Sequence, residues 1–209
     1  MKGHLITFEG TEGAGKSTLI RHVEKRLRAL GIRPVITREP GGSPVAEKIR
    51  EVILAKKMDS WTELFLYEAS RAEHLAQIIW PALAKGKIIL CDRFTDSSLA
   101  YQGMARGLPW AKVKALNHLA TQGLIPKMTV FLDVDPGRGL RRAKVKTRFE
   151  KEGVRFQKKV RKGFLKAAAE DHTGRWLKIS VKSQTPEELA DLVMKKLTKR
   201  LKLRAGKKR

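Results

Sequence analysis

The chain has 209 residues, 42% of them hydrophobic, which suits a globular protein with a real core rather than a disordered one. Its formal net charge of +24 fits a polyanionic ligand, a nucleic acid or a merely solvated basic surface. Cys91 is the only cysteine, so a disulfide framework and a thiolate zinc site are excluded, and a reducing cytoplasmic location is expected. Without an apolar run of roughly 20 residues, no membrane span is expected.

Short apolar strands alternate with helical segments along the chain. Strands are expected at residues 4–9, 33–38, 87–91, 128–134 and 175–181. Helices are expected at residues 16–30, 45–56 and 60–84, and the last helix follows the capping sequence "TPEE". This alternation predicts an α/β fold, in which helices on both faces of a five-stranded parallel sheet make three αβα layers. We expect one domain over residues 1–209, with ligands at the carboxyl ends of the strands.

The first strand ends at "GTEGAGKS", which fits the P-loop pattern between a strand and a helix. Its glycines let backbone N–H groups surround a phosphate, Lys16 can reach the β- and γ-phosphates, and the Ser17 hydroxyl can ligate Mg²⁺. A GTPase is disfavoured, because the only asparagine, Asn117, precedes His118 and cannot start the guanine-reading motif Asn-Lys-x-Asp. The predicted triphosphate-binding residues are Gly10, Thr11, Glu12, Gly13, Ala14, Gly15, Lys16, Ser17 and Thr18.

The third strand leads into "CDRFTDSSLAYQG", where Asp92 could serve Mg²⁺ or, in a mechanical ATPase, position a water. Arg93 follows directly and suits a second phosphate group better than a water. On the long helix, Tyr67 and Arg71 are four residues apart and share a face, so a ring could stack on a base while the guanidinium reaches its edge. The alternatives are core packing for Tyr67 and a surface salt bridge from Arg71 to Glu63 or Glu68.

Five segments in order resemble the signature segments of bacterial thymidylate kinases: "TFEGTEGAGKSTLI", "TREPGGSPVAEKIR", "LFLYEASRAEHL", "CDRFTDSSLAYQGMARGL" and "LDVDPGRGLRRA". The resemblance weakens only after about Gly174. It implies a P-loop kinase fold with a short mobile lid, and transfer of the γ-phosphate of MgATP to dTMP, giving dTDP and ADP. It also implies a homodimer. The rivals are a deoxynucleoside kinase, disfavoured by the phosphate-facing Arg38 and Arg93, and a nucleic-acid-binding P-loop protein, which salt titration would separate.

The same resemblance implies the roles of individual residues. The implied dTMP-binding residues are Arg38, Arg50 and Arg93 at the phosphate, Ser98 and Gln102 at the thymine, Tyr101 at the sugar, Tyr67 on the base, Arg71 at its edge and Glu12 at the 3′-hydroxyl. The implied metal residues are Ser17, Asp92 and, through water, Glu9. An alternative for Glu9 is a buried acid paired with Lys16.

The mechanism expected from this resemblance needs no general base, because a phosphate monoester with a second pKa of about 6 is already a nucleophilic anion at pH 7. Catalysis is then positioning and charge neutralisation, for which arginine forks suit phosphate oxygens. The expected catalytic residues are Glu12, Lys16, Arg93 and Arg148.

Residues 141–156, "RRAKVKTRFEKEGVRF", resemble the lid of this family. Some relatives place an arginine directly after the acidic P-loop residue, but here that residue is Gly13, so we expect Arg148 of the lid to neutralise the transferring phosphate. Lys144 and Lys146 are further lid cations, Thr147 departs from the family pattern, and Arg142 is expected against adenine. A solvated basic helix is the alternative for this segment. The basic tail, about 200–209, is expected to be a solvated terminus rather than a nucleic-acid or membrane contact.

Overall fold

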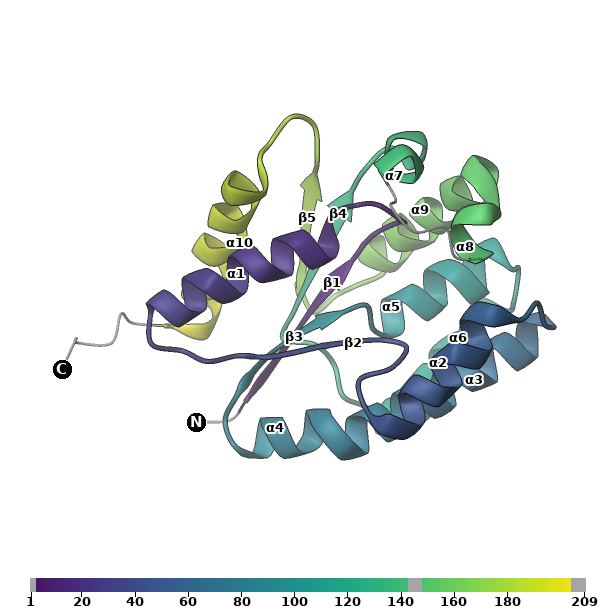
Figure 1. The fold of residues 1–209 in the computed structure, drawn as a ribbon, viewed down its shortest axis with the longest axis horizontal. Coiled ribbons are helices and arrows are strands. Elements are labelled where there is room, and N and C mark those ends of the chain that lie inside the picture. The colour runs from purple at the N-terminus through teal and green to yellow at the C-terminus, as the bar shows by residue number, and fades with distance from the viewer. Residues whose placement is uncertain (1–2, 143–147, 204–209) are drawn as a thin grey trace.

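A computed structural model describes residues 3–142 and 148–203 of the chain. The lid residues Lys144, Lys146 and Thr147 and most of the basic tail lie outside this range. The five strands form one parallel sheet in the order β2-β3-β1-β4-β5. They are β1 His4–Glu9, β2 Val35–Arg38, β3 Ile88–Asp92, β4 Met128–Asp133 and β5 Trp176–Ser180. The α/β fold with a five-stranded parallel sheet is therefore confirmed (Figure 1).

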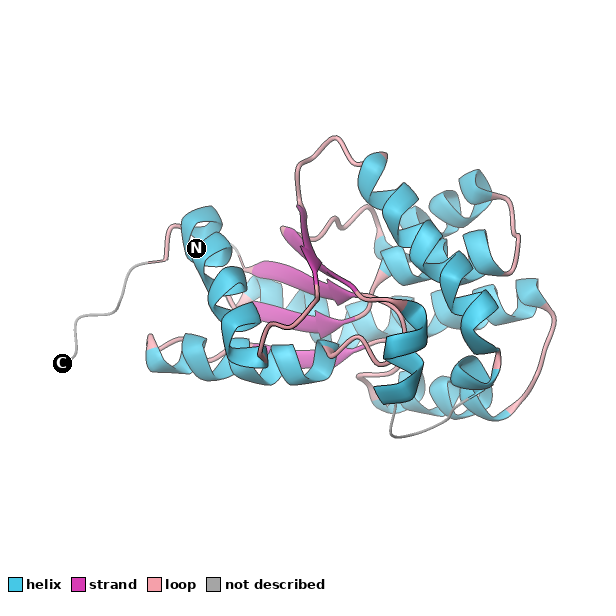
Figure 2. Ribbon diagram, turned by 90° about the horizontal axis from the view of Figure 1, so that it is seen from above, coloured by secondary structure: helices cyan, strands magenta, loops and turns pink. Residues whose placement is uncertain are grey.

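Helices lie on both sides of this sheet, as the view from above makes clear (Figure 2). The α-helices are α1 Lys16–Ala29, α2 Pro44–Ala55, α3 Ser60–His74, α4 Trp80–Ala84, α5 Thr95–Ser98, α6 Trp110–Thr121, α7 Pro136–Arg142, α8 Arg148–Lys151, α9 Gly153–Ala169 and α10 Pro186–Leu201. Two π-helical segments, η1 Leu75–Ile79 and η2 Leu99–Ala105, continue α3 and α5. The helix expected over residues 60–84 is thus present as α3, η1 and α4 in succession.

The core has two halves because successive side chains of a strand point to opposite faces of the sheet. On β1, Ile6 packs with Leu19 of α1 and Val193 of α10. Leu5, the preceding residue, packs on the other face with Ile79 of η1. All five side chains are essentially buried. Helices α1 and α10 therefore cover one face and η1 with α4 covers the other, which holds the strands and their ends rigidly in place.

Local signals in the sequence explain where several helices begin and end. Gly31, which follows α1, has a φ of 77°, a conformation that glycine adopts without strain. At the start of α10 the Thr185 hydroxyl accepts a hydrogen bond from the Glu188 N–H at 3.2 Å. The Glu188 carboxylate accepts one from the Thr185 N–H at 2.8 Å. The capping box expected at "TPEE" is confirmed.

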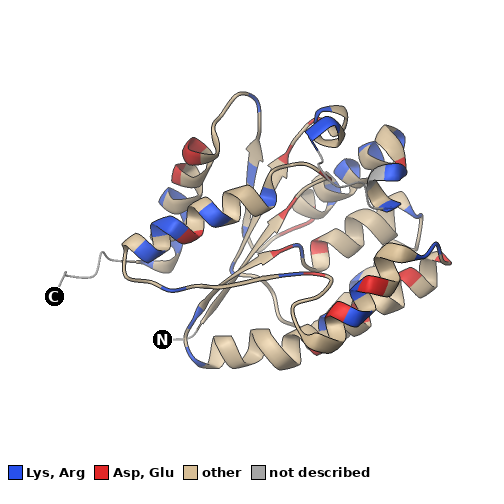
Figure 3. Cartoon of the chain, in the orientation of Figure 1, with Lys and Arg blue, Asp and Glu red and all other residues tan. Residues whose placement is uncertain are grey.

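The carboxyl ends of three neighbouring strands bring polar residues to one edge of the sheet. In the ladder Phe8 pairs with Asp92, and Arg38 also pairs with Asp92. Charged residues elsewhere are distributed over many helices, with lysines and arginines visible on α1, α7 and α10 (Figure 3). None of the helices within residues 3–142 and 148–203 is long and apolar enough to cross a membrane.

Candidate active site

The P-loop curls between β1 and α1 in a conformation that glycine permits. Gly13 and Gly15 have φ values of 69° and 95°, and a Cβ atom added to Gly13 would clash with the carbonyl group of Gly139. The buried Lys16 ammonium donates to the carbonyl oxygens of Gly10 and Thr11 at 3.2 and 3.1 Å. The loop thus folds round its own lysine and leaves backbone N–H groups to surround an anion.

Two of the three residues expected at the metal lie together at the ends of neighbouring elements. The Ser17 hydroxyl, in the first turn of α1, donates a 2.7 Å hydrogen bond to Oδ2 of Asp92, the last residue of β3. A hydroxyl and a carboxylate are hard oxygen ligands of the kind Mg²⁺ prefers, and this cation completes its shell with water and substrate phosphates. The pair fits such a site.

Glu9, the third expected metal residue, follows Phe8, the sheet partner of Asp92, and is fully buried. Its carboxylate accepts hydrogen bonds from the Phe94 N–H at 2.8 Å and the Ser97 hydroxyl at 2.6 Å. Burial, and then the neighbouring Asp96, raise the pKa of Glu9 to about 8. The alternative pairing with Lys16 is wrong, since that ammonium donates to the backbone instead. Glu9 therefore anchors the segment after β3, and its role at a metal through water stays a prediction.

Arg93 follows β3 and turns its guanidinium onto the P-loop. Its φ is 71°, a left-handed conformation that is uncommon for a residue with a Cβ atom. It donates to Glu12 Oε1 at 2.7 Å, to the Gly10 carbonyl at 3.0 Å and to the Ser97 hydroxyl at 3.2 Å. Burial opposes ionisation of Glu12, but Arg93 and then Lys16 lower its pKa overall. Arg93 and Glu12 therefore face each other as an ion pair at the mouth of the loop.

Tyr101 completes this group from η2. Its hydroxyl donates to the same Oε1 of Glu12 at 2.8 Å, and the Arg93 guanidinium lies 5.0 Å from the centre of its ring. Burial raises the pKa of the Tyr101 hydroxyl well above its usual range, so this hydroxyl stays a hydrogen-bond donor at neutral pH.

Arg71 is completely buried beneath the site, so the alternative of a surface salt bridge is wrong: 1% of its side chain is exposed. Its Nε donates to Glu39 at 2.8 Å, and Nη1 donates to Glu68 at 2.7 Å and Asn117 at 2.8 Å. Nη2 donates to the Ser98 hydroxyl at 3.0 Å. A guanidinium has five N–H groups, so one hydrogen of Nη2 has no partner among the described residues.

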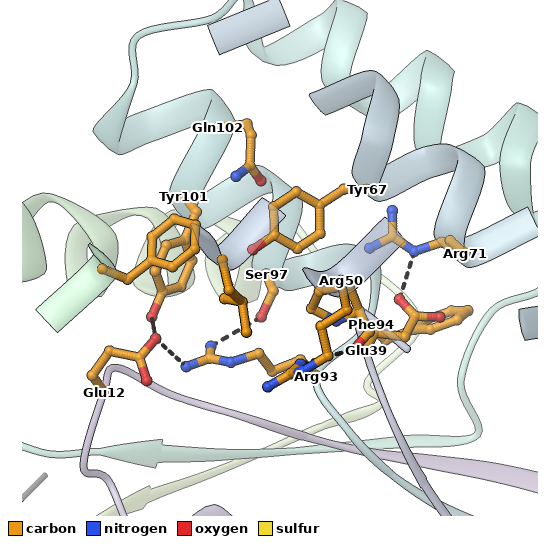
Figure 4. Close-up of a pocket in the computed structure, with 13 residues that line it drawn as sticks. Glu12, Glu39, Arg50, Tyr67, Arg71, Arg93, Phe94, Ser97, Tyr101 and Gln102 are labelled. Carbon is orange, nitrogen blue, oxygen red and sulfur yellow. Dashed lines mark hydrogen bonds and ion pairs between the residues drawn. The ribbon is translucent and has the colours of Figure 1, made fainter. Parts of the chain in front are cut away.

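An aromatic cavity lies between Arg71 and Arg93, with Tyr67 on one side and Tyr101 on the other (Figure 4). It is lined by Glu12, Glu39, Pro40, Arg50, Leu54, Tyr67, Arg71, Arg93, Phe94, Ser97, Tyr101, Gln102 and Phe149. Six of these were not in the expected set: Glu39, Pro40, Leu54, Phe94, Ser97 and Phe149. Ser97, and not the expected Ser98, forms part of the wall, because Ser98 is a hydrogen-bond partner of Arg71.

A second cavity, the P-loop cavity, adjoins the first. It is lined by Glu12, Gly13, Ala14, Gly15, Lys16, Ser17, Thr18, Arg21, Arg38, Glu39, Arg50, Asp92, Arg93 and Arg142. Four residues, Glu12, Glu39, Arg50 and Arg93, line both cavities. The two cavities therefore share a wall of two acidic and two basic side chains.

Arg38 and Arg50 lie on the outer side of this boundary. Arg38 faces the P-loop cavity and pairs with Glu47 at 2.9 Å. Arg50 of α2 donates to the Pro40 carbonyl at 2.8 Å and faces both cavities. Burial, and then Arg38, lower the pKa of Arg50. An arginine whose pKa is lowered by burial and by a second guanidinium marks a place where an anion would be stabilised.

Arg148 does not line the P-loop cavity in this structure. Its Nη2 lies 2.7 Å from Oε2 of Glu63, and its guanidinium lies 4.5 Å from the ring centre of Phe149. Its Nε is buried and has no hydrogen-bond partner among the described residues. The expectation that Arg148 faces the phosphates therefore requires it to leave Glu63.

Arg142, at the end of α7, reaches a third cavity beside the P-loop. This cavity is lined by Ala14, Gly15, Thr18, Leu19, Arg142, Val181, Gln184, Pro186 and Leu189. The loop between β5 and α10 supplies Val181 and Gln184, which sequence reasoning did not select. Gly15, Thr18 and Arg142 line this cavity and the P-loop cavity as well, so the two adjoin.

Three residues outside the expected set make contacts with it: Glu39, Glu63 and Phe149. Glu39 pairs with Arg71, and Glu63 contacts both Gln102 and Arg148. Glu63 had been considered only as a surface partner of Arg71. Spacing along α3 could have suggested it, since Glu63 precedes Tyr67 by four residues and lies on the same helical face.

Comparisons with known proteins agree with this geometry. A family model described as thymidylate kinase matches residues 8–193. A thymidylate kinase from Pseudomonas fluorescens is 50% identical over 185 residues, covering 86% of this chain and 88% of that protein. One from Bacillus pumilus is 48% identical over 172 residues, covering 78% and 81%. The crystal structure of thymidylate kinase from Ehrlichia chaffeensis has a TM-score of 0.78 and 33% identity, covering 94% of this chain and 100% of that one.

Proposed function

The chain belongs to the thymidylate kinase family, enzymes that phosphorylate dTMP to dTDP, and we propose how its residues carry out that reaction. The observation that carries the proposal is the wall that the two cavities share. MgATP occupies the P-loop cavity and dTMP the aromatic cavity, so that the γ-phosphate and the acceptor phosphate meet at Arg93 and Arg50. Holding two polyanions in line is the main task of such a site.

Arg93 neutralises the acceptor phosphate. Its contacts with Glu12, Gly10 and Ser97 hold the guanidinium in place through protein groups alone, so little reorganisation is needed at the moment of transfer. The acceptor oxygen is already ionised at neutral pH, because the second pKa of a phosphate monoester is about 6. No side chain has to remove a proton, and Lys16 and Arg93 act by charge and position.

The floor of the aromatic cavity suits a thymine base. Tyr67 offers a ring on which a base can stack. Arg71 offers a single remaining Nη2 hydrogen, since its other donors are used by Glu39, Glu68, Asn117 and Ser98. A donor that cannot become an acceptor favours the O4 oxygen of thymine over the N4 amino group of cytosine. Tyr101 and Glu12, hydrogen-bonded to each other, border the sugar and leave little room for a 2′-hydroxyl.

Mg²⁺ is the cofactor that we propose for the ATP side, held by the Ser17 hydroxyl and the Asp92 carboxylate, which lie 2.7 Å apart. When bound it would neutralise charge on the phosphates of ATP. Adenine is expected in the third cavity, between Arg142 and Gln184.

Arg148 is the lid cation that we propose for the transferring phosphate. The P-loop offers only Gly13 after Glu12, so the additional positive charge has to come from another segment. Arg148 would exchange its ion pair with Glu63 for the phosphate when both substrates are bound. Its unpartnered Nε makes the contact with Glu63 an incomplete one, and a buried donor without a partner costs about 1–3 kcal/mol.

The proposal also covers the assembly and the location of the enzyme. Residues 1–209 would act as one kinase domain, because one sheet carries both cavities. A homodimer would form through α2, α3 and α6, whose outer faces expose Val45, Val52, Phe65 and Leu119. We place the enzyme in the cytoplasm, where its buried, unpaired Cys91 would stay reduced.

The proposed function is tested by coupling ADP release to a panel of acceptors: dTMP, dUMP, dCMP, UMP and thymidine. We expect dTMP to be best, with dUMP weakly active, because one missing methyl group costs only about 1–3 kcal/mol. Thymidine serves as the control without a phosphate and should be inactive. Equal kcat/KM for dCMP and dTMP, or turnover of thymidine, would contradict the assignment.

A further inference from the structure

Glu63 of α3 lies beneath the aromatic cavity, with 1% of its side chain exposed. Its Oε1 accepts a 2.7 Å hydrogen bond from the Gln102 side-chain amide. Its Oε2 lies 2.7 Å from Arg148 and 3.3 Å from Arg106. Arg106 Nε also donates to Oε1, at 3.4 Å, so this one buried carboxylate contacts a residue of the acceptor site and two cations.

The chemistry of this contact determines which end of the Gln102 amide faces Glu63. An ionised carboxylate can only accept hydrogen bonds, whereas an amide has a donating NH₂ end and an accepting oxygen end. The NH₂ group of Gln102 must therefore turn toward Glu63, and its Oε1 atom becomes the free end. Nothing among the described residues donates a hydrogen bond to that oxygen.

The free end belongs to the cavity. Gln102 lines it, and Figure 4 shows its amide between the rings of Tyr101 and Tyr67. Arg106 contacts both oxygens of the carboxylate, so even after Arg148 has left for the phosphate Glu63 cannot turn away from Gln102 without breaking an ion pair. Glu63, which lies outside the cavity, therefore determines the orientation of the Gln102 amide.

We propose that Glu63 is a specificity-positioning residue, which turns the carbonyl oxygen of Gln102 toward the acceptor base. This inference rests on the proposed function. An accepting oxygen at this position pairs with the N3–H group of thymine or uracil, but faces the lone pair of N3 in cytosine. Together, the acceptor at Gln102 and the donor at Arg71 match the N3–H group and the O4 oxygen of thymine. They mismatch the N3 lone pair and the N4 amino group of cytosine.

The test replaces Glu63 by the isosteric Gln, whose side chain can either donate or accept. Gln102 is then free to turn over, and the discrimination between dTMP and dCMP, measured as the ratio of their Kd values by calorimetry, should narrow about tenfold or more. Glu63→Asp keeps an acceptor-only group and should keep most of the ratio. Unchanged discrimination in a folded Glu63→Gln protein overturns the proposal.

A double-variant cycle distinguishes orientation of Gln102 from a general structural effect. In a Gln102→Leu background, Glu63→Gln should leave the Kd ratio unchanged, because the amide through which it acts is gone. A further change of the ratio in that background overturns the proposal. Glu152→Gln is the matched control: it removes a carboxylate from Arg106, 2.7 Å away, without touching Gln102, and should not alter the ratio.

Folding and the proposed function are checked separately. Glu63→Gln leaves Arg148 without its carboxylate partner. If that variant does not fold, the double variant Glu63→Gln/Arg148→Gln removes the unpaired cation, and the Kd values for dTMP and dCMP are compared in it instead. A wild-type protein that fails to prefer dTMP over dCMP would contradict the proposed function. A wild type that prefers dTMP, with the preference intact in the Glu63 variant, contradicts only the role of Glu63.

Discussion

Arg93 donates a 2.7 Å hydrogen bond to Glu12, joining the residue after β3 to the P-loop. The two residues are 81 positions apart in the sequence, and the parallel pairing of β1 with β3 brings them together. Arg93 makes this contact from a left-handed backbone conformation, with φ 71°. A strained residue held by several contacts is a common feature of active sites, and here it lies on the wall between the two cavities.

Replacing Arg93 by Ala should lower kcat for dTMP by about 10²-fold or more, because a fixed donor for the transferring phosphates is lost. The KM for ATP should change little, since Lys16 and the backbone of the P-loop remain. Steady-state kinetics with each substrate varied would measure both effects. A large rise in the KM for dTMP without a change in kcat would mean that Arg93 only binds the acceptor.

Replacing Arg71 by Ala should act on binding and on stability. The variant leaves Glu39 and Glu68 buried without their cation, and breaking such a buried pair costs about 3–5 kcal/mol. We expect a lower free energy of unfolding in urea and a raised KM for dTMP, with a smaller effect on kcat. A kinetic defect identical to that of Arg93→Ala would show that the two arginines do not divide the work as proposed.

Replacing Arg148 by Ala should cut kcat by about 10³-fold if it reaches the transferring phosphate. Binding of ATP and dTMP, measured by calorimetry, should be nearly unaffected. Arg148→Lys should restore only part of the rate, because an ammonium cannot reproduce the planar fork of a guanidinium. Near-normal turnover of Arg148→Ala would assign the role to another lid cation or to none.

Glu9 should make the stability of the fold depend on pH. Its pKa is raised from 4.5 to about 8, so between these values the unfolded chain is ionised at Glu9 while the folded chain keeps the proton. The folded state then binds more protons, and the free energy of unfolding falls as pH rises, by a few kcal/mol at most. Below pH 4.5 both states are protonated and the effect disappears.

Urea unfolding of Glu9→Gln at pH 5 and pH 8 tests this. The variant should gain stability relative to the wild type on going from pH 5 to pH 8. Glu51→Gln is the control, an exposed acid paired only with Lys48, and should show no such trend. If the free energy of unfolding changed equally in the wild type and in Glu9→Gln between pH 5 and pH 8, Glu9 would be ionised in the folded protein.

Replacing Phe65 by Glu should dissociate the proposed dimer. Phe65 of α3 is 54% exposed, and Leu119 of α6 is 74% exposed on a neighbouring helix. A charge placed within an apolar interface would lose its hydration without gaining a partner. Light scattering coupled to size exclusion should report a dimer for the wild type and a monomer for Phe65→Glu. Ile125→Glu, equally exposed but outside these helices, should remain dimeric.

The sequence alone predicted the sheet, the P-loop and the arginines around it, because these features are encoded by short-range patterns. Apolar strands, helix caps such as Thr185, and glycines such as Gly13 act on their immediate neighbours. The placement of Lys16, Ser17 and Asp92 at one edge then follows from parallel strands ending together.

Tertiary structure alone decided which charges pair, since a chain with 45 lysines and arginines and 21 acids offers many combinations that spacing cannot rank. Spacing left Arg71 either at the edge of a base or in a surface salt bridge, and only the fold shows it buried between Glu39 and Glu68. Ser97 and Ser98 are adjacent in the sequence, but only Ser97 lines the cavity. Arg148 lies on Glu63, a residue of α3. These choices depend on distances across the fold and on which partners are shielded from water, where an ion pair is strongest and an unpaired charge most costly.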